Sequence, residues 1–171
     1  GKVFVATEDV EIQNEIEKNG GNAIMTGKNH QTGTDRIFEA IEKIKEIENT
    51  KYVINLQGDE PQISTEDIIN LDKNVRKLNS KIGTLGTDIK DKKIFNNKNI
   101  VKVSVNEAFQ KNNHSPALGF SRNAEDFDEK NTFHHIGIYQ YEIQTLKKFI
   151  NLKQTENEKK FRLEQLRALD N

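Results

Sequence analysis

At 171 residues the chain is about one domain long, and it can bury a core although only 33% of its residues are hydrophobic and 31% are charged. A formal net charge of −1 excludes a global attraction to nucleic acid or to an anionic membrane, so any anion site must be local. The lack of cysteine excludes disulfides and thiol catalysis, and no run reaches the roughly 18 apolar residues of a membrane span. We therefore expect a cytoplasmic protein with no nucleic-acid or membrane partner.

The first half of the chain alternates strand-like and helix-like patterns. Strands are predicted at 2–7, 23–25 and 52–56, and helices at about 9–19, from 34 or 35 through 47, and from 64 through 78. The most distinct helix carries apolar residues at three- and four-residue spacing, namely Ile37, Phe38, Ile41, Ile44 and Ile47, with Thr34 or Asp35 as its N-cap. Such alternation predicts parallel strands with helices on both faces.

The second half is less regular. Strands are predicted at 82–87, 101–105, 117–120 and 135–141, followed by two helices that end near Asp170. One of these helices would present Phe161, Leu163, Leu166 and Leu169 on its apolar face. Because no internal repeat or long linker divides the chain, we expect a single domain over residues 1–171.

A polar turn, Gln57-Gly58-Asp59-Glu60-Pro61, follows the apolar strand YVINL. Ligands of open α/β sheets bind beyond the carboxyl ends of strands, and a carboxylate there suits Mg²⁺, which prefers carboxylates, water and phosphate oxygens. Asp59 is therefore a candidate metal ligand. Gly-Asp and Pro are also ordinary turn residues, so a plain surface turn explains the same pattern.

The stretch GKNHQTGTDR, residues 27–36, is rich in hydrogen-bond donors and leads into a predicted helix N-terminus. Helix N-termini favour anionic groups, and Gly33 would let a ligand approach the backbone. The stretch matches neither GxxxxGK[ST] nor GxGxxG, and capping explains Thr34 and Asp35 equally well. Both interpretations stay open on the pattern alone.

Other polar residues are ambiguous by themselves. His134 and His135 point to opposite faces of a strand, so at most one lines a given site. Arg122 has the fork that clamps a carboxylate, although a surface ion pair is the commoner role of arginine. The histidines lack HExxH spacing, which makes a zinc site improbable.

Taken in order, a series of segments resembles the motifs of the CMP-3-deoxy-manno-octulosonate synthetases. They are ATE (6–8), MTGKNHQTGTDR (25–36), NLQGDEP (55–61), VKV (101–103), FSR (120–122), HIGIYQY (135–141) and LEQLRAL (163–169). The resemblance runs through nearly the whole chain. GDEP alone is a weak signal, but the combination at compatible separations is specific.

The resemblance implies an α/β, Rossmann-like nucleotidyltransferase fold with a mixed, mainly parallel sheet and helices on both faces. It also implies a homodimer that requires Mg²⁺ and transfers CMP from CTP to 3-deoxy-D-manno-octulosonate, releasing pyrophosphate, for lipopolysaccharide biosynthesis. An attack of the anomeric hydroxyl on the α-phosphorus, with a metal neutralising the phosphates, is the chemistry such an enzyme would use.

The resemblance also implies residue roles. Asp59 would ligate the metal and Arg122 would bind the sugar carboxylate, and both would be catalytic. The nucleotide-binding residues would be His30, Gln31, Thr32, Gly33, Thr34, Arg36 and Gln57. The sugar-acid-binding residues would be Arg122, His135, Tyr139, Glu164 and Gln165.

The chain also departs from the family pattern. It contains neither a PARxxSxRLPxKPL triphosphate loop nor a VDTPEDL segment with a second metal carboxylate. Glu8 stands for the usual Asp, Thr32 for a frequent Ser, and no Ile-Pro follows Arg122. We therefore expect a domain incomplete at both ends that binds better than it catalyses. Loss of a central strand would leave an exposed sheet edge, and with it low stability or self-association.

Two other functions are compatible with the same residues. One is a non-catalytic binding or dimerisation module that keeps the motifs without the triphosphate loop. The other is a cytidylyltransferase for another acid sugar, such as a nonulosonate, although HIGIY and LEQLR argue against it.

Overall fold

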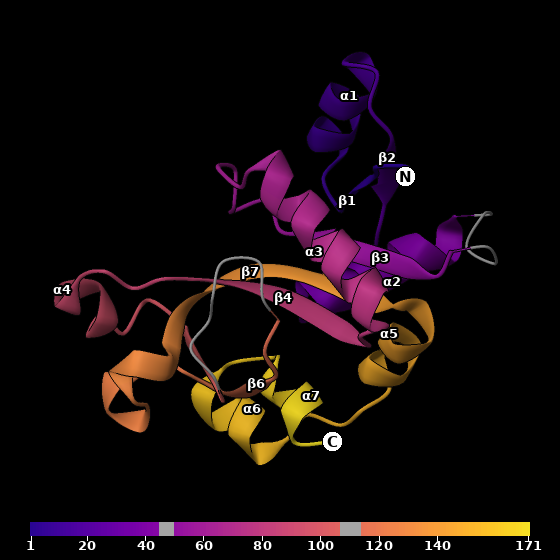
Figure 1. Ribbon diagram of the computed structural model, residues 1–171. Helices are drawn as coiled ribbons and strands as arrows, with labels where there is room; N and C mark the ends of the chain where they lie inside the picture. The colour runs from indigo at the N-terminus through magenta and orange to yellow at the C-terminus, as the bar shows by residue number, and fades with distance from the viewer. Residues whose placement is uncertain (45–49, 107–113) are drawn as a thin grey trace.

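A computed structural model describes residues 1–44, 50–106 and 114–171 of the chain, and Figure 1 shows how its elements are arranged. The N-terminal part consists of β1 (Val5–Thr7), α1 (Val10–Lys18) and β2 (Ala23–Met25). The strands β1 and β2 pair in parallel as a separate two-stranded sheet. Figure 1 shows this unit projecting from the rest of the molecule. β1 is shorter than the predicted strand 2–7, of which Lys2 and Val3 are exposed and lie outside β1.

The larger sheet contains β3 (Tyr52–Leu56), β4 (Ile82–Thr87), β5 (Lys102–Val105), β6 (Ala117–Ser121) and β7 (Thr132–Glu142). β7 is its long central strand and pairs antiparallel with β3, β4 and β5. Gln140 of β7 lies opposite both Ile54 and Gly83, so β3 and β4 occupy opposite edges of β7. Lys102 and Thr87 both lie opposite His134, which places β5 on the same edge as β3.

The predicted mixed α/β fold is confirmed, but the prediction that most strands are parallel is wrong for the described residues. There, only β1 and β2 pair in parallel. β3 and β4 do run in the same direction, as expected of strands joined by the helix α3 (Thr65–Leu78). β7, from the far end of the chain, lies between them and pairs antiparallel with each. The alternation of strands and helices in the sequence therefore predicted the relative direction of β3 and β4 correctly, but not which strands pair.

Helices cover both faces of the larger sheet, as predicted. α2 (Gly33–Lys43) and α5 (Ile143–Ile150) pack on the face that carries Tyr139 and Tyr141. α3 packs on the opposite face, against Ile138 and Tyr52. Successive strand residues point to opposite faces, so neighbouring residues of β7 contribute to two separate cores.

A third core lies where β5 and β6 meet the C-terminal segment. Its buried residues are Val103, Val105, Phe120, Phe133, Leu163 and Leu166. The prediction of two C-terminal helices is wrong, because the segment 143–171 contains α5, α6 (Glu156–Phe161) and α7 (Leu166–Leu169). α6 ends at Phe161, and its C-cap Arg162 has a left-handed φ of 54°, so Leu163 to Gln165 form a turn instead of the predicted helix. Leu163 and Leu166 had helix-like spacing because both face one core across that turn, whereas Leu169 of the predicted apolar face is exposed.

Smaller differences concern element ends. Thr32 caps α2, because its hydroxyl accepts from the backbone N–H of Asp35. The predicted caps Thr34 and Asp35 are instead inside the first turn. The short helix α4 (Lys92–Phe95) was not predicted, and β7 begins earlier than expected, at Thr132. Ile47, the last residue of the predicted α2 stripe, lies outside the described residues.

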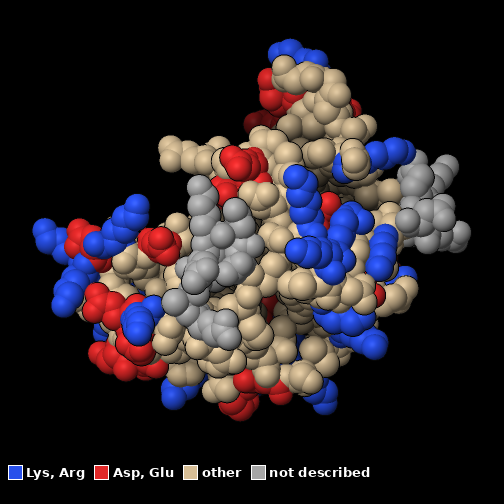
Figure 2. Space-filling view, viewed as in Figure 1, with Lys and Arg blue, Asp and Glu red and all other residues tan. Residues whose placement is uncertain are grey.

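Charges of both signs are spread over the face seen in Figure 2. Basic side chains gather over the C-terminal half of α3, whose last turn carries Arg76 and Lys77. In the part of the chain that the structure describes, no helix combines the length and the apolar character needed to cross a membrane. Within the described residues β1 pairs only with β2, and β3 pairs only with β7. β1 and β3 therefore each have one unpaired edge, and an exposed sheet edge was expected from the sequence.

Candidate active site

The polar turn after β3 lies where the sequence predicted a site. Asp59 is exposed and makes no hydrogen bond or ion pair with the described residues, so both carboxylate oxygens are open to a ligand. Gln57, two residues earlier, approaches the start of α2. Its Nε2 would lie 4.0 Å from a Cβ built on Gly33. The structure thus brings the QGDEP turn beside the GTDR segment.

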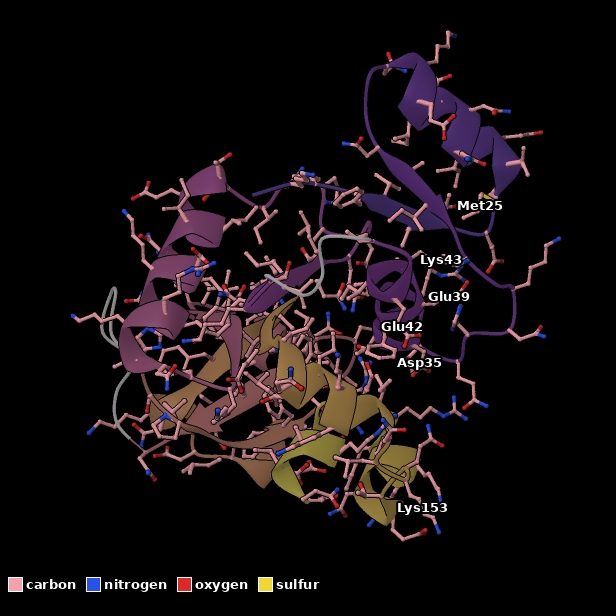
Figure 3. The ribbon with its side chains drawn as sticks, turned by 90° about the vertical axis from the view of Figure 1, so that its right-hand side faces the viewer. Met25, Asp35, Glu39, Glu42, Lys43 and Lys153 are labelled. Atoms are coloured by element: carbon pink, nitrogen blue, oxygen red, sulfur yellow. The ribbon has the colours of Figure 1, made fainter. Side chains whose placement is uncertain are left out.

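The loop before α2 is tied to that helix by Glu39. Its carboxylate accepts the backbone N–H of Gly27, at 3.0 Å and 3.1 Å, and shares a short hydrogen bond with His30. Lys43 donates to Glu39 at 2.6 Å and to the backbone oxygen of Met25 at 2.8 Å. Figure 3 shows Glu39 and Lys43 on α2 beneath Met25. Hydrogen bonds from Lys43, Gly27 and His30 lower the pKa of Glu39 to about 2.

Arg36 joins the small sheet to α2. Its guanidinium pairs with Glu8, just after β1, and donates to the hydroxyl of Thr26, just after β2, at 2.7 Å. The carboxyl ends of both strands are therefore fixed to the helix. Glu8, which departs from the family's usual Asp, is long enough to make this contact. The predicted nucleotide-binding role of Arg36 stays a prediction beside this structural one.

Thr34 connects two motifs that are far apart in the sequence. Its side chain is 1% exposed, and its hydroxyl donates to Oε2 of Glu164 at 2.8 Å, across 130 residues. Thr34 belongs to the predicted nucleotide set and Glu164 to the predicted sugar-acid set. The two predicted pockets therefore share a wall.

Glu164 is largely removed from solvent. Burial raises the pKa of its carboxyl, and the hydrogen bond from Thr34 partly offsets that rise. Its other oxygen, Oε1, is buried without a hydrogen-bond partner among the described residues and lies 3.8 Å from Arg167. A buried polar atom without a hydrogen bond is costly, so Oε1 would gain from a ligand hydroxyl that reached it.

Arg167 lies behind Glu164 and makes a buried ion pair. Its Nε donates to Oε2 of Glu158 at 2.8 Å, and both side chains are 5% exposed. Its guanidinium also lies 4.9 Å from the ring of Phe149. This arrangement joins α6, α7 and α5, and it sets the position of the turn that carries Glu164.

His135 and Tyr139 are neighbours on one face of β7. Their ring centroids are 5.4 Å apart, and Phe120 meets His135 edge to face at 5.1 Å. His135 is 7% exposed, and burial lowers its pKa to about 4, so its imidazole is neutral near pH 7. Its Nε2 lies 3.0 Å from the Thr84 hydroxyl. Burial raises the pKa of Tyr139, which keeps its hydroxyl protonated and able to donate.

The remaining predicted residues stand apart from that cluster. Arg122 follows β6 and its Nη1 donates to the backbone oxygen of Asn99 at 3.0 Å. Gln165 is the residue before α7, and Gln31 is exposed in the loop before α2. The structure therefore brings Thr34, Glu164, His135 and Tyr139 together. Asp59 and Arg122 lie on other elements and make no contact with these four side chains among the described residues.

The described residues do not build a closed metal cage, since no group of three or more His, Asp or Glu side chains among them is placed to hold an ion. Mg²⁺ commonly keeps several waters and binds one or two carboxylates plus substrate phosphates. The unpartnered carboxylate of Asp59 fits such an open site.

Several supporting residues were not predicted individually. Glu39 and Lys43 had only the common i,i+4 spacing of a helix surface as a signal. Arg167 and Lys102 lie inside the quoted LEQLRAL and VKV segments, but nothing in the sequence gave them a role. Their roles depend on partners from other elements.

Comparisons with known proteins agree with this geometry. A family model described as cytidylyltransferase matches residues 1–171. The chain is 44% identical to a protein of Thermodesulfovibrio yellowstonii named 3-deoxy-manno-octulosonate cytidylyltransferase, over 99% of this chain and 70% of the relative. A protein of Chelativorans sp. with the same name is 39% identical, over 99% and 68%.

A solved structure gives the same answer for the fold. The structure described as CMP:2-keto-3-deoxy-manno-octonic acid synthetase complexed with CTP superposes with a TM-score of 0.86 and 33% sequence identity. The superposition covers 99% of this chain and 68% of the solved one. The mixed α/β architecture is thus that of a nucleotidyltransferase, and the chain belongs to the cytidylyltransferase family.

Proposed function

We propose that the protein transfers CMP from CTP to 3-deoxy-D-manno-octulosonate, giving the CMP-sugar acid and pyrophosphate. The observation that carries this proposal is the identity of up to 44%, over 99% of the chain, with relatives named for this activity. The contact between Thr34 and Glu164 supports it, because a transferase must hold its two substrates against each other.

The nucleotide would lie against the loop and first turn of α2. His30, Gln31, Thr32, Gly33 and Thr34 are the residues we assign to it, with Arg36 and Gln57 on either side. The backbone N–H groups at the start of α2 favour an oxygen-rich ligand. Gln57 lies beside Gly33, at the start of this helix.

The sugar acid would lie on the other side of Thr34. We assign its carboxylate to Arg122, whose planar fork suits a carboxylate, and its hydroxyls to His135, Tyr139, Glu164 and Gln165. The Thr84 hydroxyl donates to the backbone oxygen of Ile138 at 2.7 Å, so Nε2 of the neutral His135 donates to Thr84 and its Nδ1 is an acceptor. The protonated Tyr139 is able to donate to a hydroxyl oxygen. The unpartnered Oε1 of Glu164 is able to accept.

Asp59 would hold Mg²⁺ together with phosphate oxygens and water. When bound, the ion would neutralise negative charge on the phosphates and on the leaving group. The protein's own contribution is to hold a sugar hydroxyl in line with the α-phosphorus. The oxygen–phosphorus bond then forms as the bond to the β-phosphate breaks, and the hydroxyl proton is lost to water or to pyrophosphate.

The proposal also covers the oligomeric state and the cellular compartment of the protein. A homodimer in the cytoplasm is what the family resemblance implies, and the unpaired edges of β1 and β3 are surfaces on which further strands can add. The product would be the activated sugar acid used in lipopolysaccharide biosynthesis.

The test is pyrophosphate release by the protein expressed from its complete reading frame, with Mg²⁺ present. We expect release with CTP and 3-deoxy-D-manno-octulosonate, and little with ATP, GTP or UTP, or with a nonulosonate as acceptor. Release with the nonulosonate in preference would move the assignment to another acid sugar. No release with any pair would leave a binding or dimerisation role.

A further inference from the structure

Lys102 is a buried lysine that the proposed reaction does not use. Its side chain is 0% exposed, and no carboxylate of the described residues lies within ion-pair distance. Taking an ammonium out of water without a counter-charge is costly. A lysine in this position therefore needs hydrogen-bond acceptors for its ammonium group. The acceptors that it contacts show which segments it holds in place.

Two backbone oxygens provide that compensation. Nζ of Lys102 donates to the oxygen of Asn97 at 2.7 Å and to the oxygen of Arg122 at 2.7 Å. The first oxygen belongs to the loop after α4 and the second to the residue after β6. Lys102 therefore joins two segments that are not adjacent in the chain, through hydrogen bonds strengthened by its charge.

The loop held by Lys102 also holds the guanidinium of Arg122. Nη1 of Arg122 donates to the oxygen of Asn99 at 3.0 Å, two residues after Asn97. The N–H of Asn99 in turn bonds the side chain of Asn97 at 2.9 Å. Lys102 thus fixes Arg122 twice, at its backbone and through the loop that its side chain contacts.

The charge of Lys102 also favours an anionic ligand at Arg122. Lys102 and Arg122 are two neighbouring cations, and their mutual repulsion, after burial, lowers the pKa of Lys102. Among the described residues, His134, directly opposite Lys102 on β7, also faces it. An anionic ligand group at Arg122 would relieve that repulsion, which favours binding of a carboxylate.

We propose that Lys102 is a positioning residue for the sugar-acid substrate, acting by holding the backbone and guanidinium of Arg122 in place to receive the carboxylate. This role rests on the proposed function, since it takes the acceptor to be a carboxylic acid. A purely structural role would instead fasten the two loops with no effect on one substrate in particular.

The test combines Lys102→Met, which keeps the length of the side chain but removes its charge and donors, with Arg122→Ala and the double variant. Lys98→Met, on the exposed part of the same loop, is the matched control. The readout is the KM for the sugar acid and for CTP, with kcat, in pyrophosphate release by the protein from its complete reading frame. Failure of the unmutated protein to release pyrophosphate would count against the proposed function, not against Lys102.

We expect Lys102→Met to raise the KM for the sugar acid about tenfold, the scale of one charge-assisted hydrogen bond, while the KM for CTP stays within about twofold. Because Lys102 acts through Arg122, the double variant should be no more than about twofold worse than Arg122→Ala alone. Equal rises in both KM values, or effects that multiply in the double variant, would overturn the proposal.

Lys102→Met leaves two backbone oxygens without their donor, and a second variant covers the case in which it fails to fold. Lys102→Arg then serves, because it keeps the charge but displaces one or both oxygens by its greater bulk. The expected result is a rise in the KM for the sugar acid of at least about threefold more than that for CTP. A folded Lys102→Arg protein with both KM values changed alike, or with neither changed, would reject the role.

Discussion

The proposed site has two parts that differ in how firmly the protein holds them. The sugar-acid wall, made of His135, Tyr139 and Glu164, is largely buried and sits on the central strand and on a turn held by an internal ion pair. The metal turn, residues 57–61, follows the end of β3, and its Asp59 is exposed without a partner.

This difference predicts how substitutions divide between stability and activity. Residues of the sugar-acid wall contribute to the core as well as to the site, so replacing them or their supports should lower stability. Residues of the metal turn contribute little to packing, so replacing them should lower activity alone. The wall also contains a polar atom without a hydrogen bond, Oε1 of Glu164, which a ligand could satisfy.

The largest expected effect comes from the support of the wall. Arg167→Met would leave Glu158 buried and unpaired, and breaking a buried pair in this way costs about 3–5 kcal/mol. For a chain of this size we expect Tm to fall by roughly 6 to 20 °C in a thermal scan. The exposed pair made by Lys159 provides the control, and Lys159→Met should change stability by less than about 0.5 kcal/mol.

A double variant sharpens this prediction. Glu158→Leu combined with Arg167→Met removes both charges, so it should regain part of the stability lost in the single variant. A single variant that loses less than about 1 kcal/mol would mean that the pair does not hold the wall.

The opposite result is expected at the metal turn. Asp59→Asn keeps the size of the side chain but removes the charge that would hold Mg²⁺, which supplies several kcal/mol in such reactions. We expect pyrophosphate release to fall at least about a hundredfold, equivalent to about 2.7 kcal/mol of transition-state stabilisation, with Tm unchanged. Glu66→Gln, an exposed acidic residue in the first turn of α3, should leave both quantities unchanged. A lower Tm in Asp59→Asn, or undiminished release, would contradict the division between the two parts.

The sequence predicted the elements of this fold better than their pairing. The strand Tyr52–Leu56 has the predicted bounds, and α2 buries the predicted Ile41. The type of an element and its bounds along the chain depend on local periodicity, which the sequence displays. The place of β7 between β3 and β4 depends on a contact between distant segments, which local patterns do not encode.

The same limit applies to the site. The motif series named residues such as Thr34 and Glu164 through a family resemblance, while the hydrogen bond between them spans 130 residues and has no local signal. Lys102 and Arg167 have no local signal of their role, because lysine and arginine are seldom buried. Only their partners, two backbone oxygens in one case and Glu158 in the other, reveal them as supports.

A smaller effect is expected where the two predicted pockets meet. Thr34→Val keeps the shape of the side chain but removes the hydroxyl that donates to Oε2 of Glu164, and losing the donor to a partly buried carboxylate costs about 1–3 kcal/mol. The cost should depend on pH. Burial already holds the pKa of Glu164 above its ordinary value, and losing Thr34 raises that pKa further. A carboxyl whose folded pKa is raised destabilises the fold increasingly as pH rises and it ionises.

Chemical unfolding of Thr34→Val at pH 5 and pH 8 checks this expectation, and the variant should lose more stability at pH 8. Thr34→Ser retains the hydroxyl and should show little of this pH dependence. An equal loss at both pH values would mean that Glu164 stays protonated throughout, or that the hydrogen bond contributes nothing.

The smallest effect is expected at Glu39, which holds the loop before α2. Its pKa of about 2 in the folded protein lies below its ordinary value of 4.5, because Lys43, Gly27 and His30 hydrogen-bond its carboxylate. The stabilisation is therefore complete above pH 4.5 and is lost as the pH falls toward 2. Glu39→Gln should flatten this part of the plot of unfolding free energy against pH, whereas Glu42→Gln, on the next turn of α2, should not (Figure 3). Identical acid slopes in both variants would show that the loop is held by its own backbone, and that His30 needs no anchor.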